Sequence, residues 1–210
     1  MENVLKNSNK ILRIRIQDCK PRLSCTQHSD IISLNFWHYF AIKYSGIKKE
    51  IIIQSNKLIY KLFHNSKNIL GILARGTDYI ALKPKNHPIP PNVSDIINDI
   101  KLMDYKNKYD YFFFSTEDEI IREKITKTFP SKLKQIIPKI KINYNYSNKT
   151  FLGFNKNVKG NIEYNKIYLL NIVILSKCLD LLASRCNGST GILILTNGFR
   201  YLKIYDNGLY

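Results

Sequence analysis

The sequence predicts an α/β protein with a Rossmann-like parallel sheet and helices on both faces. Two observations carry this prediction. From residue 69 onward, short apolar segments alternate with amphipathic segments of helical spacing, an order typical of parallel strands joined by crossover helices. The chain has 210 residues, 44% of them hydrophobic and 12% aromatic, which suffices for one large domain or for one domain and part of a second.

The first strand–helix–strand unit begins at the apolar segment Ile69–Ala74. A polar turn and a proline-rich loop follow it, and the prolines end regular structure there. Asn92 or Ser94 can cap the next helix, which carries apolar residues at helical spacing. The aromatic segment Tyr109–Phe114 then predicts a second strand.

The alternation continues to the end of the chain. Thr116 and Glu119 fit a capping box that opens a helix with Pro130 just past its end. Further elements are expected in this order: a short strand at Lys139–Tyr144, a mobile flap at Ser147–Asn161, a helix at Glu163–Cys178, a strand at Leu179–Ala183, a helix at Gly188–Leu195 and a strand at Phe199–Tyr205.

Residues 1–68 are expected to be an incomplete N-terminal segment, and residues 69–210 a nucleotide-sugar-binding domain. Within the segment, Ile11–Ile16 alternates like a short strand and Lys49–Phe63 has the pattern of an amphipathic helix. Nothing in this segment suggests a catalytic site.

The net charge of +17 favours an anionic partner: phosphate, nucleic acid, anionic lipid or a nucleotide-bearing substrate. Because the lysines are scattered among many Asn and Ile residues, we attribute them to compositional drift and expect no nucleic-acid partner. The N-terminus lacks an apolar signal core, and no apolar stretch approaches the roughly 20 residues that span a bilayer. We therefore expect a cytoplasmic protein that is able to contact a membrane surface peripherally.

The four cysteines form no C-x-x-C pair and have no regular Cys/His spacing, which argues against a zinc site or a disulfide framework. Cys178 and Cys186 are expected to be small core residues. The sequence has neither the P-loop spacing nor the G-x-G-x-x-G fingerprint, which excludes a typical NTPase or dehydrogenase.

Three segments follow predicted strands: Arg75–Tyr79, Ser115–Glu119 and Ser184–Thr190. Ligands of parallel α/β sheets bind beyond the carboxyl ends of the strands, so we expect these segments to converge on one crevice. The Arg75 guanidinium suits bidentate contact with a diphosphate. The alternative is a plain Arg75–Asp78 ion pair that stabilises the turn.

The other two segments suit different parts of one ligand. Small hydroxyl residues and glycines precede the late helix, where free N–H groups favour phosphate; the alternative is ordinary capping by Asn187 or Ser189. The acidic segment can accept hydrogen bonds from ribose or a base, whereas Glu117 and Glu119 alternatively only stabilise a helix dipole. His87 is either a general base or an inert loop residue.

Three blocks together resemble the carboxyl half of fucosyltransferase-like glycosyltransferases: ILGILARGTDYIALKPKNHPIPP, the aromatic strand with STEDE, and YLLNIVILSKCLDLLASRCNGSTGILIL. These enzymes have the GT-B fold and are related to the α-1,6-fucosyltransferase and protein O-fucosyltransferase group. The resemblance implies a nucleotide-sugar donor, typically GDP-fucose, a glycan or polysaccharide acceptor, and no required metal or other cofactor. Surface polysaccharide biosynthesis is the setting that it implies.

Carried over by position, the resemblance makes Arg75 and Asp78 the catalytic candidates, with Arg75 on the donor diphosphate and Asp78 orienting it. The donor-binding candidates are Arg75, Gly76, Thr77, His87, Ser115, Thr116, Glu117, Asp118, Arg185, Asn187, Gly188, Ser189 and Thr190. Gly76 stands where the family has a second basic residue, and about 68 residues precede the donor half. These departures leave open a truncated enzyme. The alternative to an enzyme is a non-catalytic basic binding module, either a decayed donor-binding domain or a binder of nucleic acid or anionic lipid, and the oligomeric state is left open.

Overall fold

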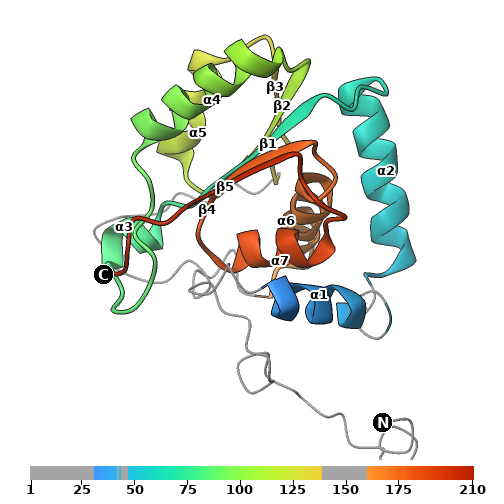
Figure 1. Ribbon diagram of the computed structural model, residues 1–210, viewed down its shortest axis with the longest axis horizontal. Helices are drawn as coiled ribbons and strands as arrows, with labels where there is room; N and C mark the ends of the chain where they lie inside the picture. Colours follow the sequence, from blue (N-terminus) through green and yellow to red (C-terminus); the bar gives the residue numbers. More distant parts are fainter. Residues whose placement is uncertain (1–30, 42, 44–46, 139–159) are drawn as a thin grey trace, which may run out of the picture.

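A computed structural model describes residues 31–41, 43, 47–138 and 160–210 of the chain. It confirms the predicted fold class: a five-stranded, all-parallel sheet lies between helices in the order β3-β2-β1-β4-β5 (Figure 1). The strands are β1 (Ile69–Ala74), β2 (Tyr111–Thr116), β3 (Leu133–Lys134), β4 (Asp180–Ser184) and β5 (Tyr201–Tyr205).

The chain changes direction across the sheet at β1. From β1 it moves outward through β2 to β3, and it then returns to place β4 and β5 on the other side of β1. Ala74 pairs with Thr116 of β2, and Leu73 pairs with Ala183 of β4, so the carboxyl ends of the three strands share one edge. Such a topological switch point is where open α/β sheets bind ligands.

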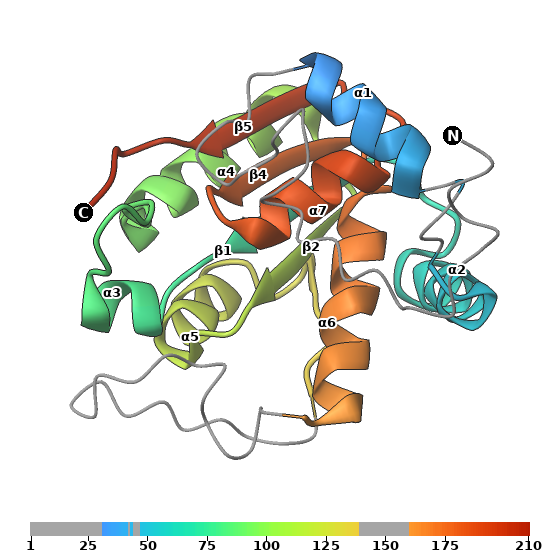
Figure 2. The ribbon, with the colours of Figure 1, turned by 90° about the horizontal axis from the view of Figure 1, so that it is seen from below.

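Helices cover both faces of the sheet (Figures 1 and 2). Those on one face are α4 (Val93–Asn107) and α5 (Glu119–Thr128), and those on the other are α2 (Lys49–Phe63), α6 (Ile162–Leu175) and α7 (Asn187–Leu195). α1 (Ile31–Phe40) lies outside α7, where the His38 ring is hydrogen-bonded to the Ile194 carbonyl oxygen at 2.7 Å. A short α3 (Asp78–Leu82) follows β1.

β1 runs through the centre of the core, and all six of its residues are buried. Leu70 and Ile72 pack toward α4 and α5, whereas Ile69 and Leu73 pack with α6 and α7. Burial on both faces explains why this strand reads as a continuous apolar run. Cys178 is buried in the same core, as predicted.

The predicted capping box is wrong. Thr116 is the last residue of β2, and Asp118 is the N-cap of α5, because its carboxylate accepts from the Ile121 N–H at 3.1 Å. Thr116 instead accepts from the Asp118 N–H at 3.1 Å. Ladder pairing with Ala74 keeps Thr116 extended, so the helix begins later.

Several predictions fall on other parts of the chain. The strands expected at 11–16 and 139–144 lie outside the described residues, as does nearly all of the flap expected at 147–161. The domain boundary at residue 68 stays a prediction; α2 packs against α6, and its Phe63 is buried in the core that α6 shares. Among the described residues, no helix has the length and apolarity to cross a membrane.

Candidate functional site

Arg75 stands at the carboxyl end of β1, at the switch point of the sheet. Its backbone N–H donates to Ser184 Oγ at 3.0 Å, which ties the ends of β1 and β4 together. Its Nη2 donates to Asp78 Oδ1 at 2.7 Å, and its Nη1 lies 3.1 Å from Glu117 Oε1. The guanidinium carbon lies 4.5 Å from the centre of the Tyr79 ring. The predicted Arg75–Asp78 ion pair is therefore present.

Arg75 remains a cation at any physiological pH. Burial by itself would lower the pKa of this guanidinium, but the carboxylates of Glu117 and Asp78 outweigh burial and raise the pKa above its ordinary value. Its Nε is buried without a hydrogen-bond partner among the described residues. The side chain is still 21% exposed, so the ion pairs hold the guanidinium in place without covering it.

The turn after Arg75 is held by two consecutive acidic residues. Glu117 Oε1 accepts from the Gly76 N–H at 3.0 Å, and Asp118 Oδ2 accepts from the Thr77 N–H at 2.7 Å. Thr77 has a φ of 44° and a ψ of −112°, a strained conformation for a β-branched residue that surrounding bonds must maintain. Glu117 and Asp118 therefore fix the conformation of the turn that places Arg75.

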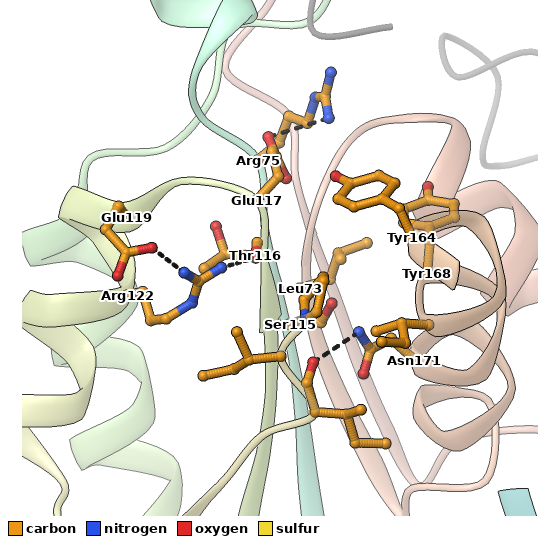
Figure 3. A pocket seen from close by; sticks show the side chains of 14 residues that line it. Leu73, Arg75, Ser115, Thr116, Glu117, Glu119, Arg122, Tyr164, Tyr168 and Asn171 are labelled. Carbon is orange, nitrogen blue, oxygen red and sulfur yellow. Dashed lines mark hydrogen bonds and ion pairs between the residues drawn. The ribbon is translucent and has the colours of Figure 1, made fainter. Parts of the chain in front are cut away.

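A cavity of about 280 Å³, here called the larger cavity, opens between the β2–α5 connection and α6 (Figure 3). Arg75 lies at one end of it. The other lining residues are Leu73, Ser115, Thr116, Glu117, Glu119, Arg122, Ile136, Ile137, Pro138, Tyr164, Ile167, Tyr168 and Asn171. Its walls thus combine apolar and aromatic surface with a few polar groups, as small-molecule sites do.

Arg122 supplies a second guanidinium to the larger cavity. Its Nη2 donates to the Thr116 carbonyl oxygen at 2.9 Å, and its Nη1 forms an ion pair with Glu119. Figure 3 shows the guanidinium extended from α5 toward the middle of the cavity, with α6 on the far side. Only 15% of the side chain is exposed, so these two contacts fix the orientation of the guanidinium.

The α6 wall carries Tyr164, Tyr168 and Asn171. Burial raises the pKa of Tyr164 to about 12 and also raises the pKa of Tyr168, so both phenols keep their protons near neutral pH. Asn171 Nδ2 donates to the Ile136 carbonyl oxygen at 3.3 Å. Its Oδ1 is buried without a partner among the described residues, which is costly unless a ligand or water supplies a donor.

A smaller cavity of about 190 Å³ adjoins the larger one. Both are lined by Leu73, Arg75, Glu117 and Tyr168, and Tyr79 and the start of α7 also line the smaller one. Asn187 and Gly188, the first two residues of α7, line it. The first N–H groups of a helix have no intrahelical acceptor. The Gly188 and Ser189 N–H groups are directed at the Cys186 side chain, so Arg75 and the Asn187 N–H are the two kinds of hydrogen-bond donor offered to an anion.

The hydroxyl groups of Ser189 and Thr190 in α7 interact with the backbone at the start of the same helix. Ser189 Oγ accepts from the Cys186 N–H at 3.0 Å and donates to the Cys186 carbonyl oxygen at 2.7 Å. Thr190 Oγ1 lies 3.3 Å from the same carbonyl oxygen. Cys186, not Asn187 or Ser189, is the N-cap, and its thiol is buried as predicted.

The predicted residues fall into two groups. Those at the two cavities or in the turn between them are Arg75, Gly76, Thr77, Asp78, Ser115, Thr116, Glu117, Asp118, Asn187 and Gly188. Ser189 and Thr190 line neither cavity, and their hydroxyl groups contact the Cys186 carbonyl oxygen instead. Arg185 pairs with Asp206, and the His87 ring lies edge-on to Tyr79 with 5.5 Å between ring centres; neither lines a cavity described here.

Sequence reasoning missed Arg122, Tyr164, Tyr168 and Asn171. A signal for three of them was present: Tyr164, Tyr168 and Asn171 are spaced by four and three residues, which places them on one face of a helix. No group of three or more His, Cys, Asp or Glu side chains in the described part of the chain is arranged to hold a metal ion.

Comparison with known proteins gives matches among solved structures. No protein-family model and no curated protein sequence matches the chain. It is similar to POFUT1 in complex with GDP-fucose, at 9% identity and a TM-score of 0.48, over 75% of this chain and 46% of that chain. For POFUT1 in complex with GDP the identity is 9%, the TM-score 0.49 and the coverage 75% and 48%. The chain thus spans about half the length of these structures.

Proposed function

We propose that this chain binds a nucleoside-diphosphate sugar, GDP-linked, at the carboxyl edge of its sheet, and that it transfers the sugar to a glycan or polysaccharide acceptor. The observation that carries the proposal is the place of Arg75. Its guanidinium is fixed between a larger cavity with apolar and aromatic walls and a smaller cavity at the start of α7. The nucleotide part of such a donor has a matching order: a flat base for the larger cavity, followed by an anionic diphosphate for Arg75 and the smaller cavity.

The diphosphate is assigned to Arg75 and the start of α7. A guanidinium binds phosphate oxygens through parallel N–H groups, and a helix start adds backbone N–H donors and a favourable dipole. The buried, unpartnered Nε of Arg75 is a further donor beside the ligand. The base is assigned to the larger cavity, where the Asn171 carboxamide has an unpartnered acceptor for an N–H group.

The same arrangement supports transfer. When the acceptor hydroxyl attacks the anomeric carbon, the bond to the phosphate oxygen breaks and its electron pair goes to the departing diphosphate, with inversion at the carbon. Arg75 stabilises that charge because its position is set before the reaction by Asp78 and Glu117. No residue is assigned to bind the acceptor or to act as the base that takes its hydroxyl proton.

The test is calorimetric titration of the purified chain with GDP, UDP, ADP and CDP, repeated on Arg75→Ala and Arg75→Lys. We expect GDP binding that Arg75→Ala abolishes and Arg75→Lys weakens, because lysine keeps the charge but not the two-pronged geometry. Arg185→Ala is the matched control, since Arg185 pairs with the exposed Asp206 and lines neither cavity. Circular dichroism confirms that each variant is folded.

Two outcomes would contradict the proposal. Unchanged nucleotide affinity in Arg75→Ala would remove the assigned donor site. Binding of GDP-sugars without release of GDP in the presence of candidate acceptors would favour a non-catalytic binding module.

A further inference from the structure

We infer that Arg122 selects the base of the donor by binding the O6 and N7 atoms of guanine. This inference rests on the proposed function, because it takes the ligand to be a nucleotide with its diphosphate at Arg75. It adds a specificity-determining residue on α5 that lies outside the three strand-end segments.

The Arg122 guanidinium is held in a fixed orientation by two contacts. One nitrogen donates to the Thr116 carbonyl oxygen at 2.9 Å, and the other terminal nitrogen is paired with Glu119. A guanidinium carries five N–H donors in one plane, so two contacts leave further donors for a ligand. Because the side chain is 85% buried between these partners and the cavity, the remaining donors keep a set direction.

The surroundings of Arg122 suit a base better than a phosphate. Ile136, Ile137 and Pro138 line the same cavity, and their apolar surface favours a flat ring over a hydrated anion. The carboxylate of Glu119 lines this cavity and not the smaller one, and it would repel a phosphate there, whereas Glu117 lines both cavities. The anion-binding donors are instead at Arg75 and the start of α7.

The donors of Arg122 match one base edge. Guanine presents two adjacent acceptors, O6 and N7, which an arginine contacts in bidentate fashion. Adenine presents an amino group in place of O6, so the same guanidinium would face a donor. Arg122 therefore favours guanine over adenine by its hydrogen-bonding pattern, while Arg75 binds the diphosphate whatever the base.

The experiment compares GDP, ADP, 7-deaza-GDP and inorganic pyrophosphate by calorimetric titration of the wild-type chain, Arg122→Leu and Arg122→Lys. In Arg122→Leu we expect GDP affinity to fall by about 5- to 150-fold, the worth of one bidentate base contact. Pyrophosphate and ADP affinities should change by less than about threefold. The corresponding change in binding free energy is less than half of the change that a tenfold difference in affinity represents. Wild-type chain should bind 7-deaza-GDP, which lacks N7, more weakly than GDP.

The lysine variant separates charge from geometry. Arg122→Lys keeps the cation but loses the planar pair of donors, so most of the preference for GDP over ADP should disappear. Full retention of that preference would overturn the bidentate contact. Circular dichroism and urea unfolding verify that both variants fold, and pyrophosphate binding reports an intact Arg75 site in each.

Failure of this inference differs from failure of the proposed function. If Arg122→Leu weakens GDP, ADP and pyrophosphate equally, Arg122 does not select guanine although the donor site stands. If wild-type chain prefers another base, the inference fails together with the GDP-linked part of the proposed function. If wild-type chain binds no nucleoside diphosphate, or if Arg75→Ala changes nothing, both fail.

Discussion

Asp118 occupies the space that a side chain at Gly76 would need. A β-carbon placed on Gly76 would be 2.7 Å from both Cβ and Cγ of Asp118, and closer still to Oδ2. Asp118 is not free to withdraw, because its carboxylate accepts from the Thr77 and Ile121 N–H groups. A second basic residue directly after Arg75 therefore does not fit here. The second guanidinium of the larger cavity comes from Arg122 instead.

Gly76→Ala should destabilise the protein. The added methyl group must push Asp118 away from the turn, and overpacking of this kind costs about 1–3 kcal/mol. Gly191→Ala is the matched control, because its β-carbon would lie 3.5 Å from Ile172 Cγ2, an ordinary contact, inside a helix. That change should be neutral or stabilising by up to about 1 kcal/mol. Urea unfolding measures both, and equal effects of the two substitutions would contradict the clash.

Asp118 should be more important for stability than an exposed helix cap. Asp118→Ala removes the N-cap acceptor, worth about 0.5–2 kcal/mol, and leaves the buried Thr77 N–H without its partner, which costs about 1–3 kcal/mol. Asp118→Asn keeps one carbonyl oxygen and should recover part of this loss. Urea unfolding of both variants checks the order. If Asp118→Ala and Asp118→Asn have the same free energy of unfolding, the two hydrogen bonds do not stabilise the protein by the expected amount.

The three central strands, β1, β2 and β4, were predictable because they are largely buried on both faces, whereas the partly buried two-residue β3 was not predicted. Ile69–Ala74 reads as an unbroken apolar run since α4 and α5 cover one side and α6 and α7 the other. The rule that strand ends meet then brought Arg75, Ser115 and Asn187 to one edge without any knowledge of side-chain contacts. The capping box, which was predicted from local chemistry alone, was wrong, because Thr116 pairs with Ala74 in the sheet and does not start the helix.

The remaining site residues depend on how elements pack. Arg122 reads as one charged residue of an amphipathic helix, and only the position of α6 opposite α5 shows that it borders a cavity. His87 is close to Arg75 in sequence, but α3 intervenes and the ring packs against Tyr79. Glu117 and Asp118 lie at the expected strand end, yet they bind the backbone of the neighbouring turn. Spacing along the chain does not reveal such partners.

Alkaline pH should weaken the fold in part through Tyr109. Its phenol donates to the fully buried Asp180 at the opposite edge of the sheet, and burial together with this carboxylate raises its pKa above the ordinary value of 10. The resulting stabilisation is complete below pH 10, where the phenol is protonated in both states, and it is lost as pH rises toward the folded-state pKa. One such proton contributes a slope of about 1.4 kcal/mol per pH unit.

Tyr109→Phe tests that slope. Below pH 10 the variant should be about 1–3 kcal/mol less stable, because Asp180 loses a hydrogen bond in the core. Above pH 10 its free energy of unfolding should fall less steeply than that of wild-type protein, while the titration of lysines is common to both. Urea unfolding between pH 8 and pH 11 measures the two curves. Parallel curves would show that Tyr109 ionises equally in both states.

Gly188 and Tyr168 should be coupled, because both line the smaller cavity that we assign to the diphosphate. A β-carbon on Gly188 would be 2.8 Å from the Tyr168 hydroxyl oxygen, so Gly188→Ala must displace the tyrosine ring. Since that oxygen ends a side chain that is 44% exposed, the ring can move, and we expect little loss of stability but weaker pyrophosphate and GDP binding.

Tyr168→Phe removes the atom that causes the crowding. The double variant with Gly188→Ala should therefore bind pyrophosphate more tightly than Gly188→Ala alone, giving a non-additive coupling of about 0.5–3 kcal/mol in a double-mutant cycle. Calorimetric titration of the four proteins measures it. Additive losses would mean that the Tyr168 hydroxyl does not limit the space at the start of α7.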